Sequence, residues 1–180
     1  MLRVRLLAVL VLAAAAAACA PTLGPPPPGY PAPVEPGRGE PAFRAHDFAW
    51  SQQPGANTIA GRLIYQRGTT RYTCAGAIVI LTPETTWSRR RMEVLYLSSE
   101  RAALPADEVR ARTAEAPPGD SSPFIKRATC DSTDRFSFTR LPDGAWYAIT
   151  IGRPVKGTGP SLALMRRVVT RGGRTVTVGL

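Results

Sequence analysis

One stretch of the sequence places an aromatic side chain beside a run of cations, a combination that can bind anions or sugars. Trp87 is followed by Ser88 and then by Arg89, Arg90 and Arg91. Guanidinium groups hold a phosphate or sulfate through paired hydrogen bonds, and an indole ring can stack on a sugar ring. The alternative interpretation is a basic, solvated loop in which the indole packs on the edge of the folded domain. We treat Trp87, Arg89, Arg90 and Arg91 as a candidate anion- or ligand-binding site.

Residues suited to enzyme or metal chemistry are scarce. The chain has 1 histidine, His46, and 3 cysteines, too few for a histidine-based catalytic dyad or a zinc-peptidase ligand set. No pair of acids has a spacing typical of general acid–base catalysis, and turn formation explains the aspartates near strand ends. The glycine-rich segment 152–159 lacks the Gly-x-x-x-x-Gly-Lys-[Ser/Thr] spacing of a phosphate-binding loop. We therefore predict a protein with no enzymatic activity, no metal and no cofactor.

The N-terminal residues have the pattern of an export signal. Arg3 and Arg5 precede the uncharged apolar stretch 6–18, which is too short to span a membrane permanently. The run Ala16-Ala17-Ala18-Cys19 resembles the lipobox of bacterial lipoproteins. That resemblance implies a signal peptide at 1–18, a palmitate-type acyl anchor on Cys19 and, because Ala20 follows, an outer-membrane location facing the periplasm. The alternative is an ordinary signal peptide with a chance cysteine at its edge.

Export determines which partners the charge would attract. The chain carries 23 Lys and Arg against 13 Asp and Glu, a net charge of +10, and removal of Arg3 and Arg5 with the signal leaves +8. In the cell envelope this charge would meet anionic lipid, lipopolysaccharide and acidic polymers rather than nucleic acid. We expect attachment to the membrane through lipid, with an envelope protein, anionic lipid or glycan as a further partner. No acid follows Asp143, but six cations do: Arg153, Lys156, Arg166, Arg167, Arg171 and Arg174.

The other two cysteines, Cys74 and Cys130, form an even pair once Cys19 is assigned to the lipid. An oxidising compartment favours a disulfide between them, which would close a loop of 56 residues. The competing interpretation is two buried free thiols. A catalytic thiol lacks the histidine or asparagine that would support it.

Composition divides the mature chain into a tether and a folded domain. Between Ala20 and Pro41, 9 of 22 residues are proline and 4 are glycine, a composition that forms neither helix nor sheet. We predict an extended tether over 19–41, a lead-in segment over 42–56 and a single folded domain over 57–180.

The folded domain has the alternation typical of β-strands. Phe136 and Phe138 share one face, and Leu141-Pro142-Asp143-Gly144 marks a turn before the next strand. Short apolar runs separated by turn residues, without helices between them, predict an all-β fold, a single antiparallel Greek-key sandwich of about seven strands. The predicted strands lie at about 59–66, 76–83, 126–130, 136–139, 146–151, 162–170 and 174–180.

The long insertion 84–122 departs from this alternation. Residues 84–96 could include a helical turn, and the segment 105–112 has the early proline and acids of a short helix. An insertion of this length in a small sandwich is either functional or mobile, and the sequence leaves the choice open.

Several segments together carry a family resemblance. They are Gly61-Arg62-Leu63, Thr73–Pro83, Thr129–Asp131 and Asp134–Tyr147, the last with the pattern Phe-x-Phe-x-x-Leu-Pro-x-Gly-x-x-Tyr. The combination resembles the carboxypeptidase regulatory-like domain, whose members have a transthyretin-like (prealbumin-like) sandwich. The resemblance implies that Gly144 turns a hairpin and that Tyr147 returns to the core. It leaves the function open.

We therefore predict a membrane-anchored envelope lipoprotein that acts as a structural or protein-interaction module. The alternative is a carbohydrate-binding module for envelope glycan or lipopolysaccharide, with Trp50, Trp87 and Trp146 as stacking faces. A glycan site predicts at least two exposed aromatics forming one platform, so burial of Trp87 and Trp146 would remove it.

Overall fold

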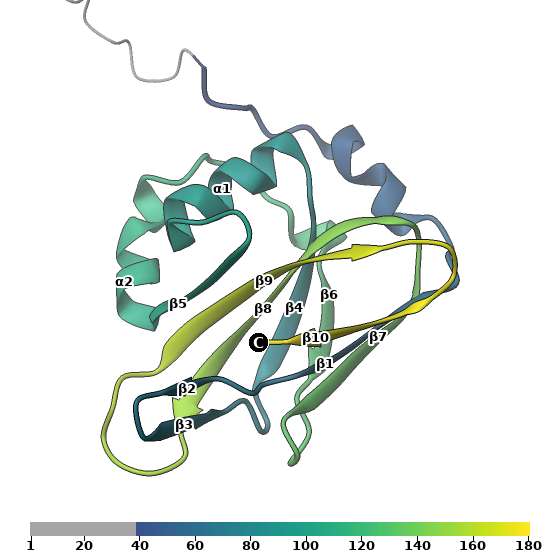
Figure 1. Cartoon of the computed structure of the whole chain (residues 1–180). Coiled ribbons are helices and arrows are strands. Elements are labelled where there is room, and N and C mark those ends of the chain that lie inside the picture. Colours follow the sequence, from purple (N-terminus) through teal and green to yellow (C-terminus); the bar gives the residue numbers. More distant parts are fainter. Residues whose placement is uncertain (1–38) are drawn as a thin grey trace, which may run out of the picture. The chain divides into compact units, whose positions relative to one another are not determined.

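Two β-sheets pack face to face in the computed structural model, which describes residues 39–180 (Figure 1). The predicted signal peptide, the predicted lipidation site Cys19 and most of the predicted tether lie outside the described residues. Within 39–180, no helix is long and apolar enough to cross a bilayer.

The larger sheet is built around the long strand β8. Strand β9 and then β5 follow on one side of β8, and β4 and then β6 on the other, while the hairpin β2–β3 pairs with the far end of β8. These strands are β2 (Gln66–Arg67), β3 (Thr70–Thr73), β4 (Ile78–Pro83), β5 (Arg101–Pro105), β6 (Lys126–Thr129), β8 (Gly144–Pro154) and β9 (Leu162–Thr170).

The smaller sheet has the order β10–β1–β7, formed by β1 (Asn57–Arg62), β7 (Arg135–Leu141) and β10 (Thr175–Gly179). All seven predicted strands are present, and the expected sandwich is confirmed. Three short strands, β2, β3 and β5, were not expected. One pair, β1 with β10, is parallel, a relation that alternation along each strand cannot indicate.

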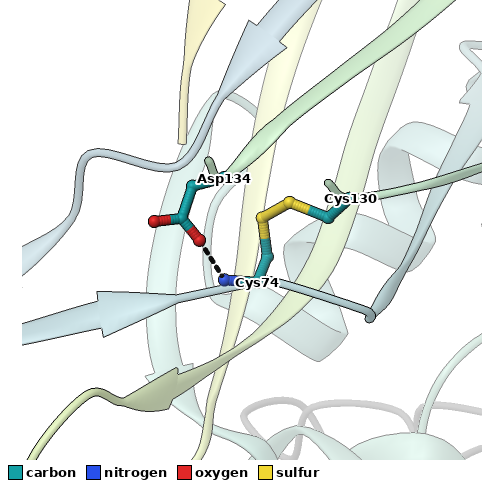
Figure 2. A group of neighbouring side chains, drawn as sticks. All are labelled: Cys74, Cys130 and Asp134. Atoms are coloured by element: carbon teal, nitrogen blue, oxygen red, sulfur yellow. Dashed lines mark hydrogen bonds between the residues drawn. A yellow bond between two sulfur atoms is a disulfide. The ribbon is translucent and has the colours of Figure 1, made fainter. Parts of the chain in front are cut away.

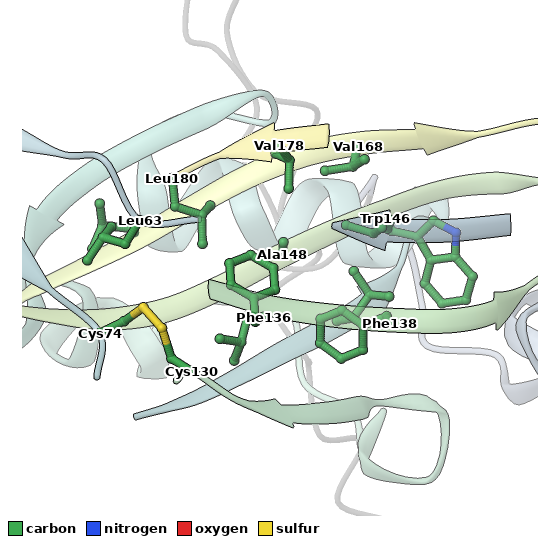
Figure 3. Close-up of a cluster of buried hydrophobic side chains, with 14 of the residues drawn as sticks. Leu63, Cys74, Cys130, Phe136, Phe138, Trp146, Ala148, Val168, Val178 and Leu180 are labelled. Atoms are coloured by element: carbon green, nitrogen blue, oxygen red, sulfur yellow. A yellow bond between two sulfur atoms is a disulfide. The ribbon is translucent and has the colours of Figure 1, made fainter. Parts of the chain in front are cut away.

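The core between the sheets contains the residues that alternation placed inward. Phe136 and Phe138 point from β7 toward Trp146 and Ala148 on β8, and Val178 closes the core from β10 (Figure 3). At the turn before β8, Gly144 has φ 156°, and an added Cβ would lie 2.2 Å from the ring of Trp50. Glycine is therefore required at this turn, as the family resemblance implied.

The insertion 84–122 is ordered and covers the outer face of the larger sheet. It forms α1 (Thr86–Tyr96), β5, α2 (Ala106–Ala111) and the 3₁₀ turn η2 (Arg112–Ala114), and the turn η3 (Ser122–Phe124) begins at its end. A capping box starts α1: the Ser88 N–H donates to Thr85 Oγ1 and the Thr85 N–H to Ser88 Oγ.

Packing of this helical layer gives β8 two buried faces. Met92 and Leu95 of α1 contact Tyr147, Ile149 and other residues on the outer face of the sheet. Tyr147 is therefore buried beneath the helices and not in the sandwich core to which the family resemblance assigned it. Alternation alone could not show which layer buries Tyr147, because a strand covered on both faces has apolar residues at odd and even positions alike.

The lead-in segment 42–56 packs on the sandwich, and the compact unit begins at Gly39. Its 3₁₀ helix η1 (Ala45–Gln52) buries Phe48 completely and sets the Trp50 ring 4.9 Å from that of Trp146. These aromatic contacts attach the start of the described chain to the folded domain.

Candidate functional site

Trp87 of the predicted ligand site is buried, with 2% of its surface exposed. Its ring packs against Phe43 and Phe48, with centroids 5.1 and 5.9 Å away, and its Nε1 donates to the Pro118 carbonyl at 3.0 Å. Both ring edges and the single polar atom are thus used inside the protein. Trp87 offers no stacking face to a ligand.

The three arginines after Trp87 point to different partners. Arg89 forms an ion pair with Glu84, which lies just before the start of α1. Arg90 makes a two-pronged contact with Glu40, and this hydrogen bonding lowers the pKa of that carboxyl. Arg91 donates to the Pro117 carbonyl at 2.8 Å with its guanidinium 5.4 Å from the Trp87 ring. Internal contacts account for the whole cluster, and the arginines do not converge on one open site.

The tryptophan platform proposed for a glycan is also absent. Trp146 is fully buried in the sandwich core, and its Nε1 donates to Thr170 Oγ1 at 3.1 Å. Trp50 is partly buried with its ring against Trp146. With Trp87 and Trp146 both buried, the requirement for two exposed tryptophans on one face fails.

Cys74 and Cys130 form a disulfide with their Cα atoms 5.7 Å apart, as expected (Figure 2). Asp134 lies beside it and accepts hydrogen bonds from the Cys74 N–H at 2.9 Å and from Thr73 Oγ1 at 2.5 Å. Burial acts to raise the pKa of Asp134, but these bonds and the ion pair with Arg71 outweigh it and hold the pKa below its ordinary value.

The same trio has the ligand types of a metal site, since the two sulfurs and an Asp134 oxygen lie within 4.8 Å of one another. Both sulfurs are bonded to each other, however, so neither is a thiolate that could bind a metal ion. The arrangement is a disulfide bond with Cys74 held in place by its hydrogen bond to Asp134.

A groove with a volume of about 520 Å³ lies among the described residues at an open side of the sandwich. We name it the β5–β9 groove. One wall is the inner face of β5 and β9, and the other is the chain after β1 together with the end of β10. Its lining residues are Ile64, Tyr65, Gln66, Arg101, Ala102, Ala103, Leu164, Met165, Arg166, Gly179 and Leu180.

Two cations face this groove from neighbouring strands. Arg101 of β5 and Arg166 of β9 are register partners, and both lie on the face that Leu164 turns toward the sandwich core. Arg167 lies on the opposite face with Glu84, as alternation predicted for adjacent strand residues.

The facing wall is mixed in character. Ile64 is 69% exposed, and Tyr65 is half-buried with its ring centroid 5.7 Å from that of Tyr72. Gln66 follows and is exposed. The groove thus combines a supported aromatic ring, an amide and two guanidinium groups over an aliphatic floor, and these groups can bind a polar ligand that also has an apolar face.

A smaller cavity of about 300 Å³ lies beneath α1. Two of the predicted site residues, Trp87 and Arg91, line it together with Thr82, Tyr96, Asp120, Ser121, Ser122 and aliphatic residues. Burial raises the pKa of Tyr96 to about 12, so the phenol is neutral at physiological pH. Arg91 donates to the Pro117 carbonyl and Trp87 Nε1 to the Pro118 carbonyl, so both of these polar groups already have partners inside the protein.

Sequence reasoning missed the β5–β9 groove because β5 lies inside the insertion. Arg101 carries no signal of its own, and only its pairing with β9 brings it opposite Arg166. The only clue in the sequence is that adjacent strand residues such as Arg166 and Arg167 point to opposite faces, and this does not say which of the two faces the core.

Comparisons with known proteins bear on the fold. No family model matches the chain, and no curated protein matches it. Among solved structures, the chain is similar to one from Pseudomonas aeruginosa described as "a putative carbohydrate binding protein", with 20% identity and a TM-score of 0.54. The match covers 78% of this chain and 99% of the other. At this identity the likeness shows that the two chains share the β-sandwich fold.

Proposed function

We propose that the chain is a non-enzymatic, membrane-anchored module of the cell envelope that binds carbohydrate in the β5–β9 groove. The observation that carries the proposal is the composition of the groove walls, with Tyr65 and Gln66 on one side and Arg101 with Arg166 on the other. Aromatic rings pack on the apolar faces of sugars, while amide and guanidinium groups bind their hydroxyl and acidic substituents.

Two further points support this ligand class. The structurally similar Pseudomonas aeruginosa protein is described as "a putative carbohydrate binding protein". The groove also meets the chemical needs of a sugar site without the tryptophans, whose burial removes the platform first considered for a glycan.

The anchoring part of the proposal rests on the sequence before residue 39. The lipobox-like run ending at Cys19 and the proline-rich segment after it would attach the domain to a membrane through an acyl chain and a spacer. Mass spectrometry of the N-terminal peptide should find acylated Cys19 as the first residue, and Cys19→Ala should release the protein from membranes. An uncut, unmodified leader on a soluble protein would overturn this part.

Binding is tested with the detergent-solubilised full chain on an array of neutral and acidic polysaccharides. We expect binding that Tyr65→Ala weakens at least tenfold, while Val155→Ala, an exposed apolar residue outside the groove, leaves binding unchanged. The unfolding midpoint of each variant checks that the fold is intact. Recovery of an envelope protein by crosslinking, with no polysaccharide bound on the array, would instead favour the structural or protein-interaction role.

A further inference from the structure

Arg101 and Arg166 form an unfavourable pair in the absence of a ligand. They are directly opposite each other across the antiparallel strands β5 and β9, so their side chains leave the same face of the sheet next to each other. Like charges at directly opposed positions destabilise a sheet. A counter-charge supplied from outside the chain would relieve this repulsion.

Among residues 39–180, no acid lies within ion-pair distance of either arginine. The nearest acid in sequence, Glu100, faces the helical side of the sheet, where its carboxylate lies 3.8 Å from Arg89 and 3.9 Å from Arg167. Neither guanidinium is therefore paired with an acidic side chain within residues 39–180.

A second like-charge pair shows why the position of the first one matters. Arg62 of β1 and Arg135 of β7 are also register partners, but both are exposed on the outer face of the smaller sheet and neither lines the β5–β9 groove. Water screens their repulsion effectively. In the groove pair Arg101 is also exposed, but Arg166 is half-buried at the wall of the groove, where the lower dielectric strengthens its attraction for an anion.

Resting on the proposed function, we infer that the ligand of the β5–β9 groove is an acidic carbohydrate, a sugar bearing a carboxylate or phosphate oxyanion. The oxyanion lies between Arg101 and Arg166, and the sugar ring lies against Tyr65. A guanidinium fork matches the geometry of either oxyanion, and a neutral sugar would leave the two charges uncompensated.

The test uses the full chain and two matched pairs of polysaccharides. The first pair is polygalacturonate and its methyl ester, and the second is phosphomannan and dephosphorylated mannan. We expect the acidic member of at least one pair to bind at least tenfold more tightly than its neutral counterpart, and the pair that discriminates identifies the oxyanion.

The variant R101Q/R166Q removes the two groove charges, and R62Q/R135Q removes the same number of charges from the outer face. We expect the groove variant to lose binding of the acidic polymer at least tenfold and the control to lose less than twofold. Without ligand, R101Q/R166Q should unfold at the same temperature as the native chain or higher, because a repulsion is relieved, so lost binding would not reflect lost structure.

Three outcomes would overturn the inference. Equal binding of acidic and neutral polymers, unchanged in R101Q/R166Q, leaves the carbohydrate function standing and removes the acidic specificity. Equal losses in the two double variants mean a general attraction between polyanions and a basic protein. Failure to bind any polysaccharide contradicts the proposed function itself.

Discussion

Glu84 and Arg167 are joined by a hydrogen bond in which Arg167 Nε donates to Glu84 Oε2 at 2.5 Å. The same carboxylate pairs with Arg89 of α1, so one acidic side chain connects the start of the helical insertion to strand β9. The Glu84 side chain is only 11% exposed. The contact therefore fixes the insertion, and with it β5 and Arg101, on the edge of the larger sheet.

Replacing Glu84 by glutamine should destabilise the protein by about 2 kcal/mol, because two partly buried arginines lose their counter-charge. Urea unfolding at neutral pH measures the loss. Glu93→Gln is the matched control, since the Glu93 side chain is 40% exposed, against 11% for Glu84, and lies 3.6 Å from Arg90. Such surface pairs contribute about 0–1 kcal/mol, so equal losses in the two variants would contradict the role given to Glu84.

The hydroxyl of Tyr147 lies beside this charged group but has no hydrogen-bond partner among residues 39–180. Burial, with the charge of Glu84, raises its pKa, so it remains a neutral phenol. Removing an unpartnered buried hydroxyl loses no bond and relieves its desolvation. Tyr147→Phe should therefore leave the free energy of unfolding unchanged or raise it by up to about 1 kcal/mol.

Thr170→Val provides the contrast for Tyr147→Phe. The Thr170 hydroxyl is fully buried, accepts from Trp146 Nε1 and contacts the Pro142 carbonyl at 2.8 Å. Its removal should cost about 1–3 kcal/mol, because buried partners are left unsatisfied. If Tyr147→Phe costs as much as Thr170→Val in the same unfolding assay, the Tyr147 hydroxyl has a partner after all.

Asp134 should make stability depend on acid pH. Its pKa is held below the ordinary value of 3.8, so its carboxylate stabilises the fold fully above that pH and less as the pH falls through the folded-state pKa. Asp134→Asn should cost about 1.5–3 kcal/mol at pH 7, the range for hydrogen bonds to a charged group. Asparagine also tolerates the φ of 66° at this position, so the variant tests the charge.

The difference between native protein and Asp134→Asn should narrow below about pH 4, where the carboxyl of the unfolded chain takes up a proton that the folded protein does not yet bind. Chemical unfolding at several pH values follows both proteins. Glu115→Gln, at an exposed position on the insertion, should track the native protein throughout. A difference that stays constant down to pH 2 would mean that the charge of Asp134 contributes nothing.

The sandwich was predictable because its strands are covered on one face, so that burial follows a period of two. Phe136 and Phe138 show this clearly: both were expected inward and both are in the core. Tyr147 was misassigned because the helices cover the second face of β8, and a residue's parity does not say which layer buries it. The turn at Gly144 was predictable because its positive φ leaves few other choices.

The β5–β9 groove was not predictable, because it depends on which strands become neighbours. The short β5 has no strong alternation and is positioned by its pairing with β9, which is distant in sequence. The candidate site built on Trp87 was wrong for a different reason. Its residues are adjacent in sequence, but helical geometry turns Arg89, Arg90 and Arg91 in different directions, toward Glu84, toward Glu40 and over the indole.

The disulfide encloses the insertion, and this determines what its removal should do. Cys74 precedes β4 and Cys130 follows β6, so the closed loop of 56 residues contains α1, β5 and α2. Chain entropy assigns such a cross-link about 4 kcal/mol as an upper value.

Reduction of the disulfide should therefore strongly lower the urea concentration at which half of the native protein is unfolded. The variant C74S/C130S should unfold at the reduced protein's midpoint, and reductant should not shift it further. The disulfide acts on the unfolded chain, so the reduced protein should bind the groove ligand with unchanged affinity until the urea concentration is high enough to unfold it. An unchanged midpoint on full reduction, verified by thiol titration, would show that the two sulfurs contribute no constraint.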